Sequence, residues 1–79
     1  MTTREVAQFM IDRIREDGTW YQYEAVQEIE ERFGPEWIYT NENGNPAISQ
    51  QVTREFRRLH GGTIEWERGE RAWYVSEGQ

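Results

Sequence analysis

The stretch TIEWERGERAWYV, residues 63–75, alternates apolar and polar residues on both sides of a glycine-containing turn. A period of two over two short runs is typical of a β-hairpin with one buried face. We expect a loop of two residues at 68–69, which pairs Ile64 with Trp73, or a four-residue loop at 67–70. A three-residue loop would place Trp66 and Trp73 on opposite faces, and we reject it. The predicted buried face therefore holds Ile64, Trp66, Trp73 and Val75.

The segment before this hairpin has the spacing of an amphipathic helix. Asn45-Pro46 is a favourable helix start, because Asn caps helix N-termini and Pro fits the first helical position. Gly61-Gly62 is expected to end the helix. Its apolar stripe consists of Ile48, Val52, Phe56 and Leu59, and we expect this stripe to pack on the hairpin. With Trp66 in that core, Trp66→Ala is expected to cost about 3–5 kcal/mol.

The N-terminal half predicts two more helices and a short strand. Thr2 and Glu5 form a capping box that begins the first helix, and Asp17-Gly18 ends it. Residues 19–22 are short, aromatic and β-prone. The second helix follows and is stopped by Gly34-Pro35. Its apolar face is formed by Ala25, Val26, Ile29 and Phe33.

Residues 36–45 are the least regular part of the chain. Residues 37–40 look extended, and the Asn-rich residues 41–44 look like a turn. An extended aromatic segment needs an anchor, so we expect Trp37 to be largely buried against the helices. The connection between the second and third helices is then about 11 residues long, well beyond a tight turn.

The predicted order of helix, short strand, helix, helix and β-hairpin is that of a winged helix-turn-helix. This is an α+β fold with a C-terminal hairpin as its wing, and we expect residues 1–79 to form one such domain. The chain also resembles a family of small uncharacterised bacterial proteins. The shared runs are Tyr21-Gln22-x-x-Ala25-Val26-x-x-Ile29, Phe33-Gly34, Asn41-Glu42-Asn43-Gly44-Asn45-x-Ala47-Ile48 and Trp66-Glu67. The resemblance supports the fold and implies no site.

Composition narrows the range of partners. The chain has 9 basic and 15 acidic residues, a net charge of −6, which disfavours nonspecific binding to nucleic acid or anionic membranes. Without cysteine, neither a disulfide nor a thiolate metal site is available. No apolar run approaches the roughly 18 residues of a membrane span. We therefore expect a cytoplasmic protein.

No motif predicts catalysis. His60 is the single histidine, and no nucleophile is placed beside it by the sequence. Glu24, Glu28 and Glu31 share one helix face, but carboxylate metal sites draw ligands from several helices. A calcium loop would need Asp and Glu where Tyr39 and Gln50 stand. We predict that the protein is not an enzyme. We also expect it to bind no cofactor, metal or small-molecule substrate.

The outward face of the predicted third helix is the first candidate site. Residues 45–62 carry three arginines and one glutamate, in contrast to the acidic remainder. Gln and Arg are the side chains that contact adenine and guanine edges in the major groove, and the second helix of a helix-turn-helix enters that groove. The candidate nucleic-acid-binding residues are Gln50, Arg54, Arg57 and Arg58, with Arg68 and Arg71 on the hairpin. Weak binding to duplex DNA is the slightly favoured function.

Protein recognition is the alternative. Tyr and Trp are enriched at interface hot spots, and the segment 20–39 holds more of them than a small core can hide. The candidate protein-binding residues are Trp20, Tyr21, Tyr23, Trp37 and Tyr39. Ile11, on a flank of the first helix, would serve a homodimer. A substantial Tyr/Trp patch exposed on the folded domain would favour this alternative over DNA.

Overall fold

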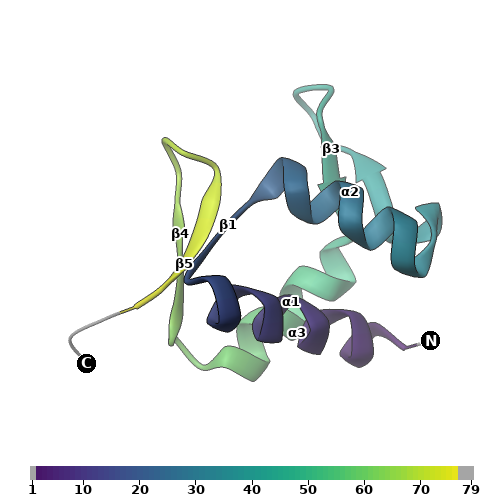
Figure 1. Cartoon of the computed structure of the whole chain (residues 1–79). Coiled ribbons are helices and arrows are strands. Elements are labelled where there is room, and N and C mark those ends of the chain that lie inside the picture. Colours follow the sequence, from purple (N-terminus) through teal and green to yellow (C-terminus); the bar gives the residue numbers. More distant parts are fainter. Residues whose placement is uncertain (1, 77–79) are drawn as a thin grey trace.

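The computed structural model describes residues 2–76. Within that range the chain forms α1 (Thr3–Asp17), α2 (Gln22–Phe33) and α3 (Gln50–His60), with the short 3-10 helix η1 (Pro35–Trp37). The strands are β1 (Thr19–Tyr21), β2 (Ile38–Thr40), β3 (Pro46–Ile48), β4 (Ile64–Glu67) and β5 (Ala72–Val75). The fold is therefore α+β, as expected (Figure 1). None of the described helices combines the length and apolarity needed to cross a membrane.

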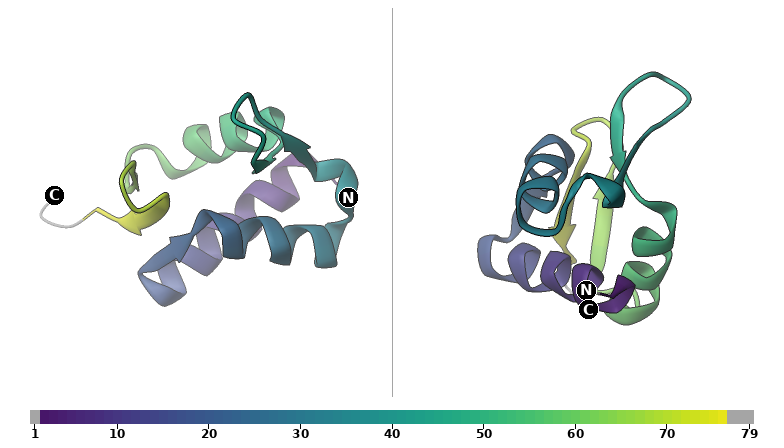
Figure 2. Two further views of the ribbon diagram at one scale, coloured as in Figure 1. Left: turned by 90° about the horizontal axis from the view of Figure 1, so that it is seen from above. Right: turned by 90° about the vertical axis from the view of Figure 1, so that its right-hand side faces the viewer.

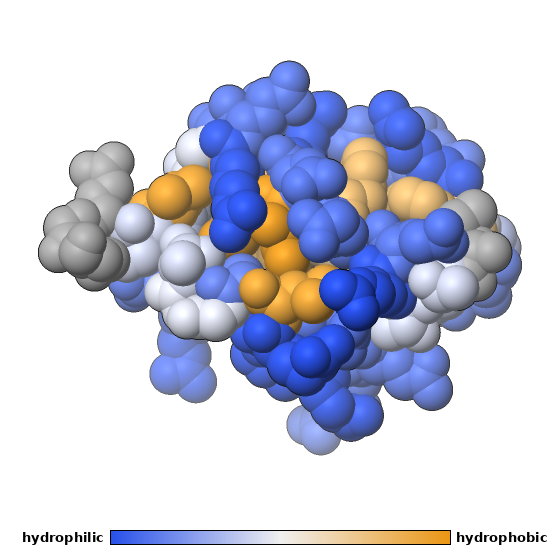
Figure 3. Space-filling view, turned by 90° about the horizontal axis from the view of Figure 1, so that it is seen from below, coloured by the Kyte–Doolittle hydropathy of each residue, from blue (hydrophilic) through white to orange (hydrophobic). Residues whose placement is uncertain are grey.

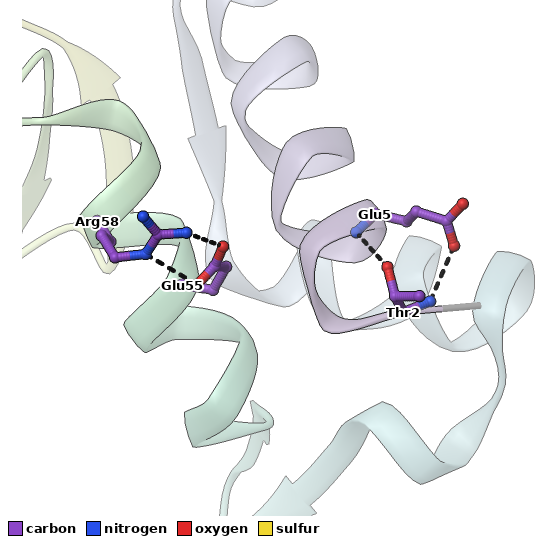
Figure 4. Close-up of polar contacts among 4 residues, drawn as sticks. All are labelled: Thr2, Glu5, Glu55 and Arg58. Atoms are coloured by element: carbon purple, nitrogen blue, oxygen red, sulfur yellow. Dashed lines mark hydrogen bonds and ion pairs between the residues drawn. The ribbon is translucent and has the colours of Figure 1, made fainter.

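The ends of α1 follow the local signals in the sequence. The Glu5 backbone N–H donates to Thr2 Oγ1 at 3.1 Å, and the Thr2 backbone N–H donates to Glu5 Oε1 at 2.8 Å (Figure 4). Gly18 ends the helix at φ 84°, a left-handed conformation that costs glycine little, and its N–H donates to the Ile14 carbonyl. The predicted capping box and the predicted stop are both confirmed.

Three strands form an antiparallel sheet in the order β1-β5-β4. β4 and β5 pair Ile64 with Val75 and Trp66 with Trp73, so the predicted parity of the hairpin is confirmed. The predicted register is wrong by two residues, and the loop comprises residues 68–71. Arg71, the predicted partner of Trp66, has a left-handed φ of 53° that does not fit a strand, and its carbonyl accepts from the Gln22 N–H instead.

The predicted start of the third helix is wrong. Pro46–Ile48 is a strand that pairs with β2, and α3 begins only at Gln50, after Ser49. Asn41 closes this β2–β3 hairpin, because its Oδ1 accepts from the N–H groups of Asn43 and Asn45. Pairing with residues 38–40 gives residues 46–48 backbone partners that an isolated helix start lacks. The hairpin also explains the long connection between α2 and α3.

The helices enclose the core from three sides. Figure 2 shows α2 and α3 on opposite sides of the molecule with α1 below them. The core cluster consists of Val6, Ala7, Met10, Ile11, Ile14, Trp20, Ala25, Val26, Ile29, Ile48, Val52, Phe56, Ile64 and Trp73. From below, hydrophobic residues show mainly in a narrow strip between hydrophilic ones (Figure 3). Ile11 is only 2% exposed and packs inside the monomer, so it is not available as the homodimer contact we expected.

Two tryptophans lie nearer the surface than expected. Trp66 is 43% exposed, so its predicted place in the core is wrong. It lies on β4, an edge strand of the sheet, whereas its partner Trp73 lies on the central strand β5. Trp37 is half-buried against the core cluster rather than largely buried. Its carbonyl accepts from the Ser49 N–H at 2.8 Å, which ties the connection to the start of α3.

Candidate binding groove

The turns of the two hairpins point to the same side of the molecule (Figures 1 and 2), and a two-part groove lies between the hairpins. The first part, about 530 Å³, has α3 as one wall and is lined by Gln22, Tyr39, Asn41, Ala47, Ile48, Thr53, Phe56, Arg57, His60, Ile64, Trp66 and Trp73. The second part, about 660 Å³, is lined by Tyr21, Gln22, Tyr23, Val26, Asn41, Asn43, Asn45, Pro46, Trp66, Arg68, Glu70 and Arg71. Both parts share Gln22, Asn41 and Trp66, so we treat them as one surface, the hairpin groove.

The exposed aromatic side chains lie along the hairpin groove. Among the described residues, the large hydrophobic side chains exposed to solvent are Tyr21, Tyr23, Tyr39 and Trp66. All four line the groove. Strand alternation explains Tyr21, because β1 turns Trp20 into the core and its neighbour outward. Tyr23 follows on α2, 69% exposed, with its ring centroid 5.9 Å from that of Tyr21.

Trp66 packs against aromatic rings that belong to the core. Its ring centroid lies 5.0 Å from that of Trp73. Trp73 in turn meets Phe56 edge-on at 5.7 Å and Trp20 at 6.4 Å. A series of contacting rings thus runs from the core to the groove surface, and packed rings of this kind favour one orientation of the exposed indole.

The groove carries more positive than negative side chains. Arg57, Arg68 and Arg71 line it, against the single carboxylate of Glu70. Glu65, on the other face of β4, accepts from the Tyr74 hydroxyl at 3.2 Å and from Ser76 Oγ at 2.8 Å. That hydrogen bond and the nearby carboxylate raise the pKa of Tyr74. The local charge is therefore opposite in sign to the net charge of the chain.

His60 is the last residue of α3 and lines the first part of the groove. Its Nδ1 accepts from the Gly62 N–H at 3.0 Å, and its ring packs edge-on against Phe56. Burial lowers the pKa of His60, and the charges of Arg15 and Arg57 lower it further. A neutral imidazole that caps the end of a helix fits this geometry. Within residues 2–76, no group of three or more His, Asp or Glu is placed to hold a metal ion.

The six candidate nucleic-acid-binding residues do not form one uniform surface. Gln50, Arg54 and Arg57 are exposed on α3, and Arg68 and Arg71 are exposed on the β4–β5 turn. Arg58 is also exposed, but it pairs with Glu55 through two hydrogen bonds, at 2.5 and 3.1 Å (Figure 4). Gln50 Nε2 donates to the Tyr39 hydroxyl at 3.4 Å, so the first turn of α3 contacts the β2–β3 hairpin.

The candidate protein-binding residues divide into two groups. Trp20 is buried, so it does not offer the exposed ring expected of a protein-binding residue, and Trp37 is half-buried. Tyr21, Tyr23 and Tyr39 are exposed and line the groove. Sequence reasoning missed Trp66 because it assigned that residue to the core. Its position near the turn of a terminal hairpin was the available signal.

One family model matches residues 2–75, and its description is a family of unknown function (DUF6953). No curated protein and no solved structure matches the chain. The matched range begins before α1 and includes β5, so the whole hairpin groove lies inside it.

Proposed function

The chain belongs to the family of unknown function DUF6953, and we propose that it is a winged-helix module that binds a segment of a partner protein in the hairpin groove. The winged-helix assignment is supported by the element order and by the sheet order β1-β5-β4. In this assignment the β4–β5 hairpin is the wing. The β2–β3 hairpin is an insertion between the two helices of the helix-turn-helix.

The observation that carries the proposal is the convergence of the four exposed aromatic residues on one groove. Exposed apolar surface gathered in one place marks an interaction site more often than scattered residues do. Tyr and Trp also bury a large area with few rotatable bonds, so they bind at a low entropic cost. A plain solvated surface would not require these rings to lie together.

The shape of the groove favours a polypeptide over a small molecule. Small-molecule sites enclose most of the ligand surface, whereas Tyr23 is 69% exposed and Trp66 is 43% exposed. An extended segment lying between the two hairpins would cover these rings along its length. Grooves lined by aromatic residues are a recurrent way to bind extended peptides.

The test is a selection of peptides from a random display library on the intact domain, followed by amide-resolved NMR with each enriched peptide. We expect the backbone signals of residues 21–23 and the indole N–H of Trp66 to shift. Tyr23→Ala combined with Trp66→Ala should abolish binding. Tyr74→Ala is the matched control, because Tyr74 lies on the opposite face of the sheet beside Glu65. Failure to recover any peptide that binds the groove would contradict the proposal.

Duplex DNA is the second candidate partner, and the exposure of Gln50, Arg54 and Arg57 on α3 favours it. Three features weaken it. The chain has a net charge of −6, Arg58 is paired with Glu55, and Gln50 contacts the inserted hairpin. Affinity for DNA depends mainly on cationic contacts to phosphate, so these features limit the expected affinity. A protein segment in the hairpin groove is the better supported partner.

A further inference from the structure

We infer that the hairpin groove binds an extended acidic segment, in which Asp or Glu flank apolar or proline residues. The inference rests on the proposed function, because it names the chemistry of the segment that the groove receives. It depends on how charge is distributed around the groove and on which rings line it.

The arginines are divided between the two parts of the groove. Arg57 projects from α3 into the first part, while Arg68 and Arg71 stand on the wing beside the second part. The guanidinium group binds carboxylates through paired hydrogen bonds. Of the acids of the wing, Glu65 accepts from Tyr74 and Ser76 and Glu67 accepts from the Gly69 N–H, so Glu70 is the one carboxylate among the residues that line the groove. A segment with carboxylates at its two ends would meet a cation at each.

The net charge of −6 does not prevent this binding. The screening length at physiological ionic strength is about 8 Å, whereas the molecule measures 35 × 28 × 19 Å. Acidic residues on the far side of the domain are therefore largely screened from a segment in the groove. Their repulsion still discourages docking of an acidic segment elsewhere, so the groove is the place where such a segment is attracted.

The aromatic rings define what lies between the carboxylates. Tyr21 and Tyr23 form a tilted pair with ring centroids 5.9 Å apart, and Trp66 lines the same part of the groove. Proline and other apolar side chains of an extended chain dock between such rings. The segment we expect is therefore acidic at both ends and apolar in its middle.

The experiment uses the intact domain and the random peptide library described above. We expect peptides selected on the parent to be enriched in Asp and Glu over Lys and Arg. Arg68→Glu combined with Arg71→Glu should weaken their binding by on the order of tenfold or more. The neutral pair Arg68→Gln with Arg71→Gln should weaken it less. Arg4→Glu with Arg15→Glu is the control, since it alters the total charge equally on residues of α1 outside the groove.

The possible outcomes separate the two proposals. Loss of binding in the wing variants with the control unchanged supports an acidic segment. Groove-binding peptides without acidic enrichment, or an equal loss in the control, would overturn the inference and leave the protein-binding function standing. If no peptide binds the groove, the proposed function itself fails. All three arginine variants change exposed side chains, and their folding is checked by the dispersion of the NMR spectrum.

Discussion

Trp66 and Trp73 face each other across neighbouring strands with ring centroids 5.0 Å apart, yet Trp66 is 43% exposed and Trp73 only 8%. The pair therefore joins the core to the hairpin groove. Trp73 contacts the core rings of Phe56 and Trp20. Trp66 covers that cluster from outside and presents its other face to solvent.

Substitution of the two tryptophans should separate stability from binding. Trp73→Ala removes a buried ring, and we expect it to cost about 3–5 kcal/mol of unfolding free energy. Trp66→Ala loses the contact between the two rings, worth about 1 kcal/mol, and the part of the indole surface that is buried, so it should cost less than Trp73→Ala. Urea denaturation measures both. If Trp66→Ala were as destabilising as Trp73→Ala, Trp66 would be part of the core and not of a binding surface.

Asn41→Ala should loosen the β2–β3 hairpin without unfolding the domain. The Asn41 side chain accepts hydrogen bonds from the N–H groups of Asn43 and Asn45. Loss of both is expected to cost about 1 kcal/mol, because the freed groups are accessible to water. Hydrogen exchange should accelerate at residues 43 and 45 and stay unchanged in α1. Protection that persists at these two amides would show that the backbone alone holds the turn.

His60 should make stability fall in mildly acidic solution. Its pKa is lowered in the folded protein, first by burial and then by Arg15 and Arg57. The unfolded chain therefore binds the proton more tightly, and stability is lost as the pH falls below about 6.5. Glu55, whose pKa is lowered mainly by its hydrogen bond to Arg58, contributes only below about pH 4.5.

The measurement is the urea midpoint of the parent and of His60→Gln between pH 7.5 and 5.5. We expect the parent to lose more stability than the variant over this range. Parallel curves would mean that His60 titrates alike in the folded and unfolded states.

Duplex DNA provides the discriminating counter-experiment. At low salt we expect a dissociation constant in the micromolar range or weaker, and four arginine contacts predict a salt slope of about −3 to −4. Arg54→Glu with Arg57→Glu should abolish this binding. Arg54→Glu alone should leave peptide binding intact, since Arg54 does not line the groove. Submicromolar DNA binding through α3 would make DNA the better supported partner.

The sequence predicted correctly those helix ends that depend only on contacts between neighbouring residues. The capping box of Thr2 and Glu5 and the glycine stops at Gly18 and Gly61 need only neighbouring residues, and they are confirmed. Asn45-Pro46 is an equally strong local signal, yet it lies in a hairpin. Residues 46–48 form a strand because they pair with residues 38–40, and the helical periodicity gives no indication of that pairing.

The candidate groove was only partly predictable for a related reason. Alternation correctly assigned Trp66 and Trp73 to one face, but the burial of each ring depends on the strand order, which places β5 in the centre of the sheet and β4 at its edge. Tyr21 and Tyr23 were expected at a surface because of their number, and they are exposed. Tyr39 shares the groove with them and with Arg68 and Arg71 because of the β2–β3 hairpin, which the sequence did not reveal.

The pairing of β1 with β5 has a consequence for biosynthesis. Trp20 lies opposite Trp73, so β1 cannot pair until β5, about 50 residues later in the chain, has been synthesised. At roughly 5–20 residues per second, the ribosome needs several seconds to supply that partner. During this interval Trp20 and the apolar stripe of α1 lack their final cover. The nascent chain is thus accessible to chaperones and proteases until β5 emerges.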